Sequence, residues 1–254
     1  MRSRSQRRIV LTISYIVIFI VGFALAYEIK APIIIQTPPE KVTTLPFQNY
    51  SATTNVLAVK GDGTTGVMGK VIVEIIPGKG RVLMDTNPFL EPDTQYSAET
   101  AVSVAENFTH KSLADRDVIL SFNITGNVLG GPSAGSAMAI ATIAAIEQKQ
   151  VRPDVAITGT IESDGSIGQI GGVLEKAQAA GTNNMKIFLV PKGEAVMTYY
   201  EKQVKIQKIA PGFTIQRVQY VPKTLDVANY TMTEWEMTTK EVSDISEVAA
   251  IMLK

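Results

Sequence analysis

The sequence predicts an α/β (α+β) fold, in which helices pack on a mixed β-sheet, preceded by one N-terminal transmembrane helix. Segments with the alternating pattern of a strand are followed by segments whose apolar residues recur at helical spacing. Some neighbouring strand segments are arranged as a hairpin and others are separated by a helix, which is typical of a mixed sheet. An uncharged run at residues 9–27 predicts the membrane helix. With 254 residues, of which 45% are apolar, the chain is long enough to bury a core.

The N-terminal segment is expected to lie in a membrane. Its uncharged run of 19 residues follows four arginines and no acid, and a helix of that length spans roughly 28 Å, close to a bilayer's hydrocarbon core. The arginine-rich flank predicts a single-pass protein of the cell membrane, with a cytoplasmic N-terminus and an extracytoplasmic body. A cleaved signal peptide is the alternative, because Ala24-Leu25-Ala26 resembles a cleavage site, and the body would then be secreted. The arginines argue against a third interpretation, a buried soluble helix.

These patterns divide the chain into three regions: 1–27 as a transmembrane anchor or signal segment, 28–56 as an extracytoplasmic linker, and 57–254 as one globular domain. The linker contains four prolines among many Thr and Gln residues and shows no helical period. Four Asn-x-Ser/Thr sequons are compatible with an exported body: Asn49, Asn107, Asn123 and Asn229.

Strand patterns open the globular domain. Residues 66–76 alternate toward a β-branched stretch and stop at a Pro-Gly-Lys-Gly sequence, so we expect 66–76 and the short strand 81–85 to pair as a hairpin. Residues 97–108 show the apolar spacing of a helix, and 118–122 follow as a strand. Residues 133–149 are apolar on nearly every side, which predicts a buried helix.

The second half of the domain alternates strands and helices. We expect strands at 154–158, 186–190 and 214–221, and helices at 172–180, 194–204 and 243–253. The segment 225–242, with Trp235, is open to three interpretations, a lid, an oligomer contact or a surface loop, and a surface loop is the default.

Composition excludes several kinds of site. The chain has no cysteine, which rules out disulfides, thiol nucleophiles and Cys-ligated clusters, and its single histidine rules out a multi-His metal centre within one chain. Residues 28–254 carry 20 basic and 24 acidic side chains, so the body offers no basic footprint for nucleic acid. The Gly-Lys pairs at 69–70 and 78–79 do not fit a Walker A loop, and we expect no ATP, metal or other cofactor.

Three stretches carry residues of chemical interest. Ser133 stands at a helix start, where free N–H groups and the positive helix end suit an oxyanion, although an ordinary N-cap explains the same residue type. Lys176 lies at the edge of an apolar stripe, where burial would lower its pKa toward that of a general base, although a lysine with a solvated ammonium gives the same pattern. The strand at 151–160 ends in threonines, which β-propensity also explains.

Together these stretches resemble the proteolytic domain of Lon proteases. Four segments carry the resemblance in matching order: 131–135 (Gly-Pro-Ser-Ala-Gly) resembles the nucleophile motif, 151–159 the following strand, 170–180 the segment with the catalytic lysine, and 186–192 the next strand. The separation of Ser133 and Lys176 also fits, and a weaker resemblance covers most of 60–254. Short members with an N-terminal membrane segment and no ATPase, known from archaea, are the most similar.

The resemblance implies a Ser/Lys dyad, in which Ser133 attacks a peptide carbonyl to form an acyl-enzyme and neutral Lys176 accepts and returns the proton. It implies Thr158 as a support that hydrogen-bonds the lysine or the nucleophile region, and N–H groups beside Ser133 as the oxyanion site. The implied activity is that of an ATP-independent serine endopeptidase acting on peptides or unfolded polypeptides, within a homo-oligomeric ring. His110 is the one candidate for a Ser-His pair and is interpreted as a cation at a helix C-terminus.

Two positions depart from the family's pattern. Gly130 stands where many members carry an acid two residues before the proline, and Thr160 replaces an acid after the Thr-Gly of the strand. These differences leave the dyad intact but keep an alternative open: a catalytically weak or silent module that binds polypeptides or scaffolds an assembly at the membrane. An amidase or esterase with the same dyad is a third hypothesis.

Overall fold

The computed structural model describes residues 15–21, 43–46, 48–61, 63–85, 87–126, 128–210 and 212–254. The chain divides into two units, Met1–Lys41 and Val42–Lys254. In the first, residues 15–21 are helical and their side chains are exposed. Most of the predicted span 9–27 lies outside the described residues, and none of the helices within them combines the length and the apolarity needed to cross a bilayer.

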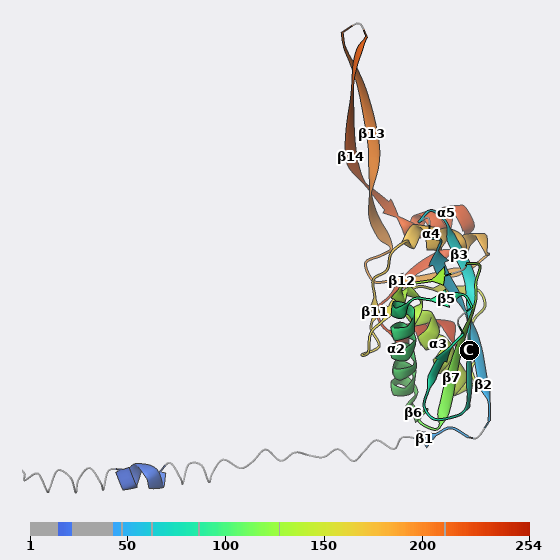
Figure 1. Cartoon of the computed structure of the whole chain (residues 1–254), viewed down its shortest axis with the longest axis vertical. Coiled ribbons are helices and arrows are strands. Elements are labelled where there is room, and N and C mark those ends of the chain that lie inside the picture. The colour runs from blue at the N-terminus through green and yellow to red at the C-terminus, as the bar shows by residue number, and fades with distance from the viewer. Residues whose placement is uncertain are drawn as a thin grey trace, which may run out of the picture. The chain divides into compact units, whose positions relative to one another are not determined.

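The second unit is a mixed α/β fold whose largest sheet has four strands in the order β2-β3-β7-β4 (Figure 1). Antiparallel pairs join the first three strands, and β4 runs parallel to β7. The strands are β2 (Tyr50–Val59), β3 (Gly66–Pro77), β7 (Arg116–Asn123) and β4 (Val82–Met84). β2 includes residues 50–56 of the predicted linker, because Tyr50 and Val56 are buried in the core.

The predicted hairpin of 66–76 and 81–85 is wrong, because β7 lies between β3 and β4. The buried carboxylate of Asp117 explains this arrangement. It accepts hydrogen bonds from the backbone N–H groups of Lys79 (2.9 Å) and Arg81 (3.1 Å) and from the Arg81 guanidinium. These hydrogen bonds fix the turn at 78–81 over the start of β7. The chain therefore enters β4 on the side of β7 that is opposite to β3.

The second sheet has three parallel strands in the order β15-β12-β9. They are β9 (Val155–Ile157), β12 (Ile187–Pro191) and β15 (Thr238–Val242). The buried Asn55 of β2 links the two sheets, since its Nδ2 donates to the carbonyls of Pro153 and Val155, both at 3.1 Å.

Helices fill the space around these sheets. They are α2 (Pro92–Thr109), α3 (Gly135–Glu147), α4 (Val173–Thr182), α5 (Val227–Trp235) and α6 (Ile245–Met252). Every residue of α3 from Gly135 to Ile146 is buried, as predicted from its all-round apolar sequence. The larger core cluster surrounds α2 and α3, and a smaller one surrounds α4 and β12.

Short elements complete the unit. They are β1 (Thr43–Thr44), β5 (Phe89–Leu90), β6 (Lys111–Ser112), β8 (Val128–Leu129), β10 (Thr160–Ile161), β11 (Ile167–Gly168) and the 3-10 turn η1 (Pro132–Ala134). β1 pairs with β6 and β5 with β8, both parallel, while β10 and β11 are antiparallel.

The region from 194 to 242 differs most from the prediction. The expected helix at 194–204 is instead part of β13 (Val196–Ala210), which forms a long antiparallel hairpin with β14 (Phe213–Asp226). Cross-strand pairing over this length, between segments rich in Tyr, Val and Ile, outweighs the helical spacing. The predicted loop 225–242 contains α5 and β15, because Asp226 caps α5 by accepting from Asn229 N and β15 pairs with β12.

A buried arginine ties the start of the unit to the large sheet. Arg116 is fully buried, and its guanidinium donates to the carbonyls of Leu45 (3.0 Å), Pro46 (2.5 Å) and Gln48 (3.3 Å). A single side chain therefore satisfies the backbone of the segment that enters β2.

We predict that Arg116→Met lowers the free energy of unfolding by about 2–4 kcal/mol, because buried carbonyls lose their donors. Urea titration of the two proteins measures the difference. Arg152→Met is the matched control, since its ion pair with Asp154 is partly solvated and is expected to contribute about 1 kcal/mol or less. Equal losses for the two variants would contradict the assigned role of Arg116.

Candidate active site

Ser133 lies in the middle of η1, immediately before α3. Gly131 precedes the turn with φ 84° and ψ 154°, a conformation that favours glycine because it has no Cβ. Pro132 then begins the turn, where its missing N–H costs no hydrogen bond. The Gly-Pro-Ser order therefore lets the chain reverse sharply and leaves Ser133 half-buried at the helix start.

The end of β9 holds the serine turn from one side. Thr158 is fully buried, and its hydroxyl donates to the Ser133 carbonyl at 3.3 Å. Gly159 N donates to the same carbonyl at 3.0 Å, and the Gly159 carbonyl accepts from Ser136 N at 3.1 Å. Thr158 thus contacts the nucleophile region through the main chain of Ser133.

The first turns of α2 hold the serine loop from the other side. Thr94 Oγ1 donates to the Gly131 carbonyl and Ser97 Oγ to the Pro132 carbonyl, each at 3.2 Å. Side chains of α2 and backbone groups after β9 therefore fix the residues that carry Ser133.

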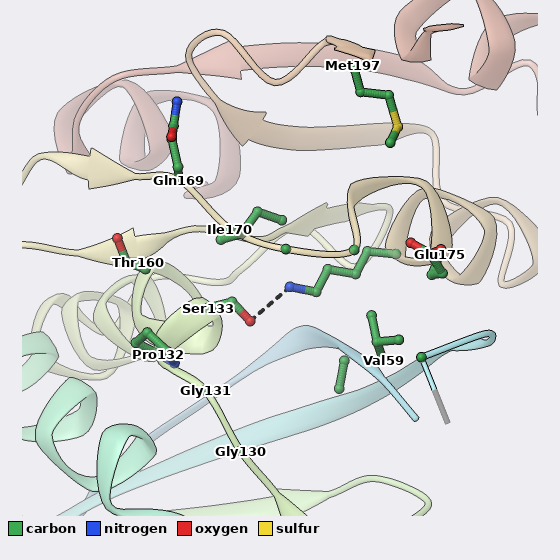
Figure 2. A pocket seen from close by; sticks show the side chains of 15 residues that line it. Val59, Gly130, Gly131, Pro132, Ser133, Thr160, Gln169, Ile170, Glu175 and Met197 are labelled. Atoms are coloured by element: carbon green, nitrogen blue, oxygen red, sulfur yellow. Dashed lines mark hydrogen bonds between the residues drawn. The ribbon is translucent and has the colours of Figure 1, made fainter. Parts of the chain in front are cut away.

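Lys176 reaches Ser133 from α4. Gly172, at φ 69°, is the N-cap of this helix, and Lys176 lies one turn later with 3% of its surface exposed. Its Nζ donates to Ser133 Oγ at 2.9 Å (Figure 2). The structure therefore brings together Ser133 and Lys176 from two different helices, and Thr158 supports the same turn.

Burial sets the protonation of the lysine. Desolvation of the ammonium lowers the pKa of Lys176 to about 8, and the carboxylates of Glu194 and Glu175 oppose this shift. Glu194 is held in place because its Oε1 accepts from Ile170 N at 2.9 Å. A pKa near 8 gives a useful neutral fraction at physiological pH, which a general base requires.

Ser133 and Lys176 face a pocket of about 800 Å³. Its walls are mostly backbone and apolar side chains: the glycine loop 130–131, the segment 169–172, Val59, Ile170 and Met197 (Figure 2). Sequence patterns did not indicate Val59, Gln169, Met197 or Glu194, since these residues come from separate elements and share no motif; Glu175 has only its place beside Lys176 as a signal.

Both positions that depart from the family's pattern line this pocket, namely Gly130 and Thr160. The Glu91 carboxylate, from the residue before α2, occupies the place where a side chain on Gly130 would begin. An acidic group is therefore present beside Gly130, although another element supplies it.

His110 does not approach the serine. It is the C-cap of α2, with φ 52°, whereas Ser97, near the other end of the helix, contacts the serine loop. The separation of 13 residues from Ser97 to His110 corresponds to roughly 20 Å of helix. Among the residues that the structure describes, no group of three or more His, Asp or Glu side chains is arranged to hold a metal ion.

Comparison with known proteins agrees with this geometry. The model of the Lon protease (S16) C-terminal proteolytic domain matches residues 46–228. Similar relatives include the archaeal Lon proteases of Halobacterium salinarum, 27% identical over 68% of this chain, and Archaeoglobus fulgidus, 29% identical over 61%. Lon protease 1 of Syntrophobacter fumaroxidans is 35% identical over 48% of the chain and is matched over 15% of its own length. The chain spans about a quarter of the two archaeal relatives, 24% and 25% of their lengths.

We predict that Lys176→Met raises the free energy of unfolding at pH 7 by about 2–3 kcal/mol. The folded-state pKa of about 8 lies below 10.5, the ordinary pKa of a lysine, so the folded protein bears the cost of a desolvated charge at pH 7, at about 1.4 kcal/mol per pKa unit. Wild-type stability rises with pH between the two values, because the unfolded chain binds the additional proton there.

Denaturant titration at pH 7 and pH 10 tests this prediction. The gain from Lys176→Met should shrink at pH 10, where the folded lysine is neutral. Lys186→Met, at an exposed lysine, should change little at either pH. If Lys176→Met were less stable than wild type at pH 7, burial of the ammonium would not destabilise the folded protein.

Proposed function

Because the chain belongs to the family of the Lon protease (S16) C-terminal proteolytic domain, a family of serine peptidases, we propose that it is an endopeptidase acting through a Ser133–Lys176 dyad. The observation that carries the proposal is the 2.9 Å hydrogen bond between Lys176 Nζ and Ser133 Oγ. Its substrates would be peptides or unfolded polypeptides, which the family resemblance implies and the mostly apolar lining of the pocket supports.

The geometry supports a two-step reaction. As Ser133 Oγ attacks the scissile carbonyl carbon, neutral Lys176 accepts the hydroxyl proton, and the carbonyl oxygen becomes an oxyanion. Backbone N–H groups at or beside Ser133 would stabilise that charge. The intermediate expels the amine, which takes the proton from Lys176, and leaves an ester on Ser133. Water then attacks the ester, again with Lys176 as the base, and frees the acid.

Thr158 would act as a positioning residue in this scheme. Its hydroxyl and the N–H of Gly159 both bind the Ser133 carbonyl, so they fix the serine backbone while leaving Oγ free to react. This placement keeps the helix-start N–H groups aligned with the attacked carbonyl.

Cleavage by this chain would not draw on ATP, because its 254 residues contain no Walker A loop. We place the catalytic unit outside the cytosol, tethered by residues 9–27 as a single membrane span, or secreted if that segment is removed. The apolar run and the arginines before it support this placement. Self-association into a ring is part of the proposal and is supported by the family resemblance.

The second candidate is a catalytically weak or silent module that binds polypeptides or scaffolds an assembly at the membrane. Gly130 and Thr160 favour it, since both depart from the family's pattern and both line the pocket. A serine-reactive acylating probe separates the two candidates. Labelling that Ser133→Ala abolishes supports the peptidase, whereas folded protein that does not react supports the silent module.

We predict that Ser133→Ala and Lys176→Ala each lower casein cleavage by at least ~10³-fold, because the dyad acts as a unit. Lys176→Arg should be equally inactive, since a guanidinium does not accept a proton near neutral pH. Peptide release, followed with and without ATP, measures the loss. Lys186→Ala serves as the matched control and should retain full activity. Cleavage that persists in Ser133→Ala would exclude Ser133 as the nucleophile.

We also predict that kcat/KM rises with pH and levels off above about pH 8, following deprotonation of Lys176. The rise should approach tenfold per unit on the acid side. Glu194→Gln should move the rise to lower pH, because the Glu194 charge raises the lysine pKa. A flat profile between pH 6 and 9 in both proteins would be inconsistent with lysine as the base.

A further inference from the structure

The hairpin of β13 and β14, residues 196–226 and called the arm below, has two unlike faces. Paired residues such as Val204 and Val218 share a face, and neighbours along a strand alternate. One face, called the apolar face below, carries Val196, Tyr200, Val204, Ile206, Val218, Tyr220 and Pro222, interspersed with Lys202, Lys208, Gln216, Asp226 and threonines. The other is polar along its middle: Glu201, Gln203, Lys205, Gln207, Arg217 and Gln219.

Among the residues that the structure describes, no other element covers the apolar face of the arm. Tyr200, Ile206 and Tyr220 are 68%, 71% and 61% exposed, and the arm extends away from α2 and from the sheets (Figure 1). A two-stranded ribbon is only marginally stable alone in water, and its long apolar edges are a template for association. A partner that covers this face would therefore stabilise the arm.

The distribution of charge distinguishes between two ways in which a second copy of the chain could cover the apolar face of the arm. The arm carries five basic and two acidic side chains, whereas residues 28–195 and 227–254 together carry 15 basic and 22 acidic. Pairing one arm with another would bring two basic ribbons together. Laying an arm on the acidic body of another copy joins opposite charges, so electrostatics favours the second arrangement.

One surface of the body matches the arm in both polarity and charge. Besides the arm and residues 15–21, the described residues include three exposed large apolar side chains: Phe89, Tyr96 and Met232. Phe89 and Tyr96 are 71% and 70% exposed, and three exposed carboxylates accompany them, from Glu91, Asp93 and Glu99. Asp93, Tyr96 and Glu99 follow one another at three-residue spacing on α2, which places them on one side of the helix.

We propose that the arm of one copy binds the docking face of the next, where the docking face is Phe89, Glu91, Asp93, Tyr96 and Glu99. The aromatic side chains of the two surfaces pack together, and Lys202 and Lys208, on the apolar face of the arm, pair with the carboxylates. Aromatic residues bury about 150–250 Å² each, so Phe89 and Tyr96 together supply roughly 300–500 Å² of the ~800 Å² per partner that is typical of a specific interface.

This contact is heterologous, so it continues from copy to copy and closes into a ring when the rotation permits. The contact between copies also affects the candidate active site. The inner side of the same α2 turns holds the serine loop, through Thr94 to Gly131 and Ser97 to Pro132. A docked arm therefore braces, from outside, the turns that position Ser133 of its neighbour. The inference deepens the proposed self-association, and its test does not depend on peptidase activity.

Cross-linking of the full chain in lipid nanodiscs or detergent tests the contact. The native chain has no cysteine, so Ile206→Cys on the arm and Tyr96→Cys on the docking face create the only thiols. A bismaleimide with a reach of about 10 Å should convert the double variant into a ladder of dimers, trimers and larger species. Neither single variant should cross-link. Gln207→Cys with Tyr96→Cys is the matched control, since Gln207 lies on the polar face, and should yield at least tenfold less ladder.

The other outcomes overturn the proposal. Dimers from Ile206→Cys alone would mean that arms pair with each other, and a double variant that stays monomeric would mean that the arm serves a membrane or a substrate instead. A charge exchange gives a second test. Lys202→Glu with Lys208→Glu should reduce the ladder at least tenfold, and adding Asp93→Lys and Glu99→Lys in the same chain should restore it. Failure of the restored variant, with an unchanged circular dichroism spectrum, would refute the docking face.

Discussion

The site depends on a single constraint: the amine of Lys176 is taken out of water and has the Ser133 hydroxyl as its hydrogen-bond partner. Desolvation opposes the charged form and lowers the pKa to about 8, whereas an exposed lysine would stay protonated at neutral pH. Glu175 and Glu194 limit the shift, so the lysine remains titratable near physiological pH. The apolar surroundings of α4 are therefore part of the chemistry as well as of the core.

The remainder of the fold holds the serine against this amine. Two elements that are distant in sequence bind main-chain carbonyls at and before Ser133. One is α2, through the hydroxyls of Thr94 and Ser97. The other is the end of β9, through Thr158 and Gly159. The buried helix α3 then continues from the turn into the larger core. Gly135 matters because a Cβ there would lie 2.6 Å from Ser97 Oγ and 2.9 Å from Ile161 N, and so would push α2 and β10 away from the serine turn.

Much of this arrangement could be predicted from sequence because it is local. The Gly-Pro-Ser turn, the buried helix after it and the apolar stripe around Lys176 each follow from residues within one or two turns of chain. The position of β4 could not be predicted, since it depends on Asp117, more than 30 residues later, binding the turn at 78–81. The second strand of the arm was expected at 214–221, whereas the first was mistaken for a helix at 194–204, because its pairing partner decides its conformation and spacing along one strand does not show that partner. Glu91 and Glu194 reach the site from other elements and leave no motif.

Ser133 and Lys176 belong to different parts of the core. Ser133 precedes α3 in the larger hydrophobic cluster, and Lys176 lies on α4, which with β12 forms the smaller one. Local opening of the smaller cluster would carry the lysine away while the large sheet and α3 stay folded. The hydrogen bond between Lys176 and Ser133 therefore joins the two hydrophobic clusters of the core. Loss of function on heating would follow the free energy of that partial opening, which is smaller than the free energy of global unfolding, so inactivation should precede melting.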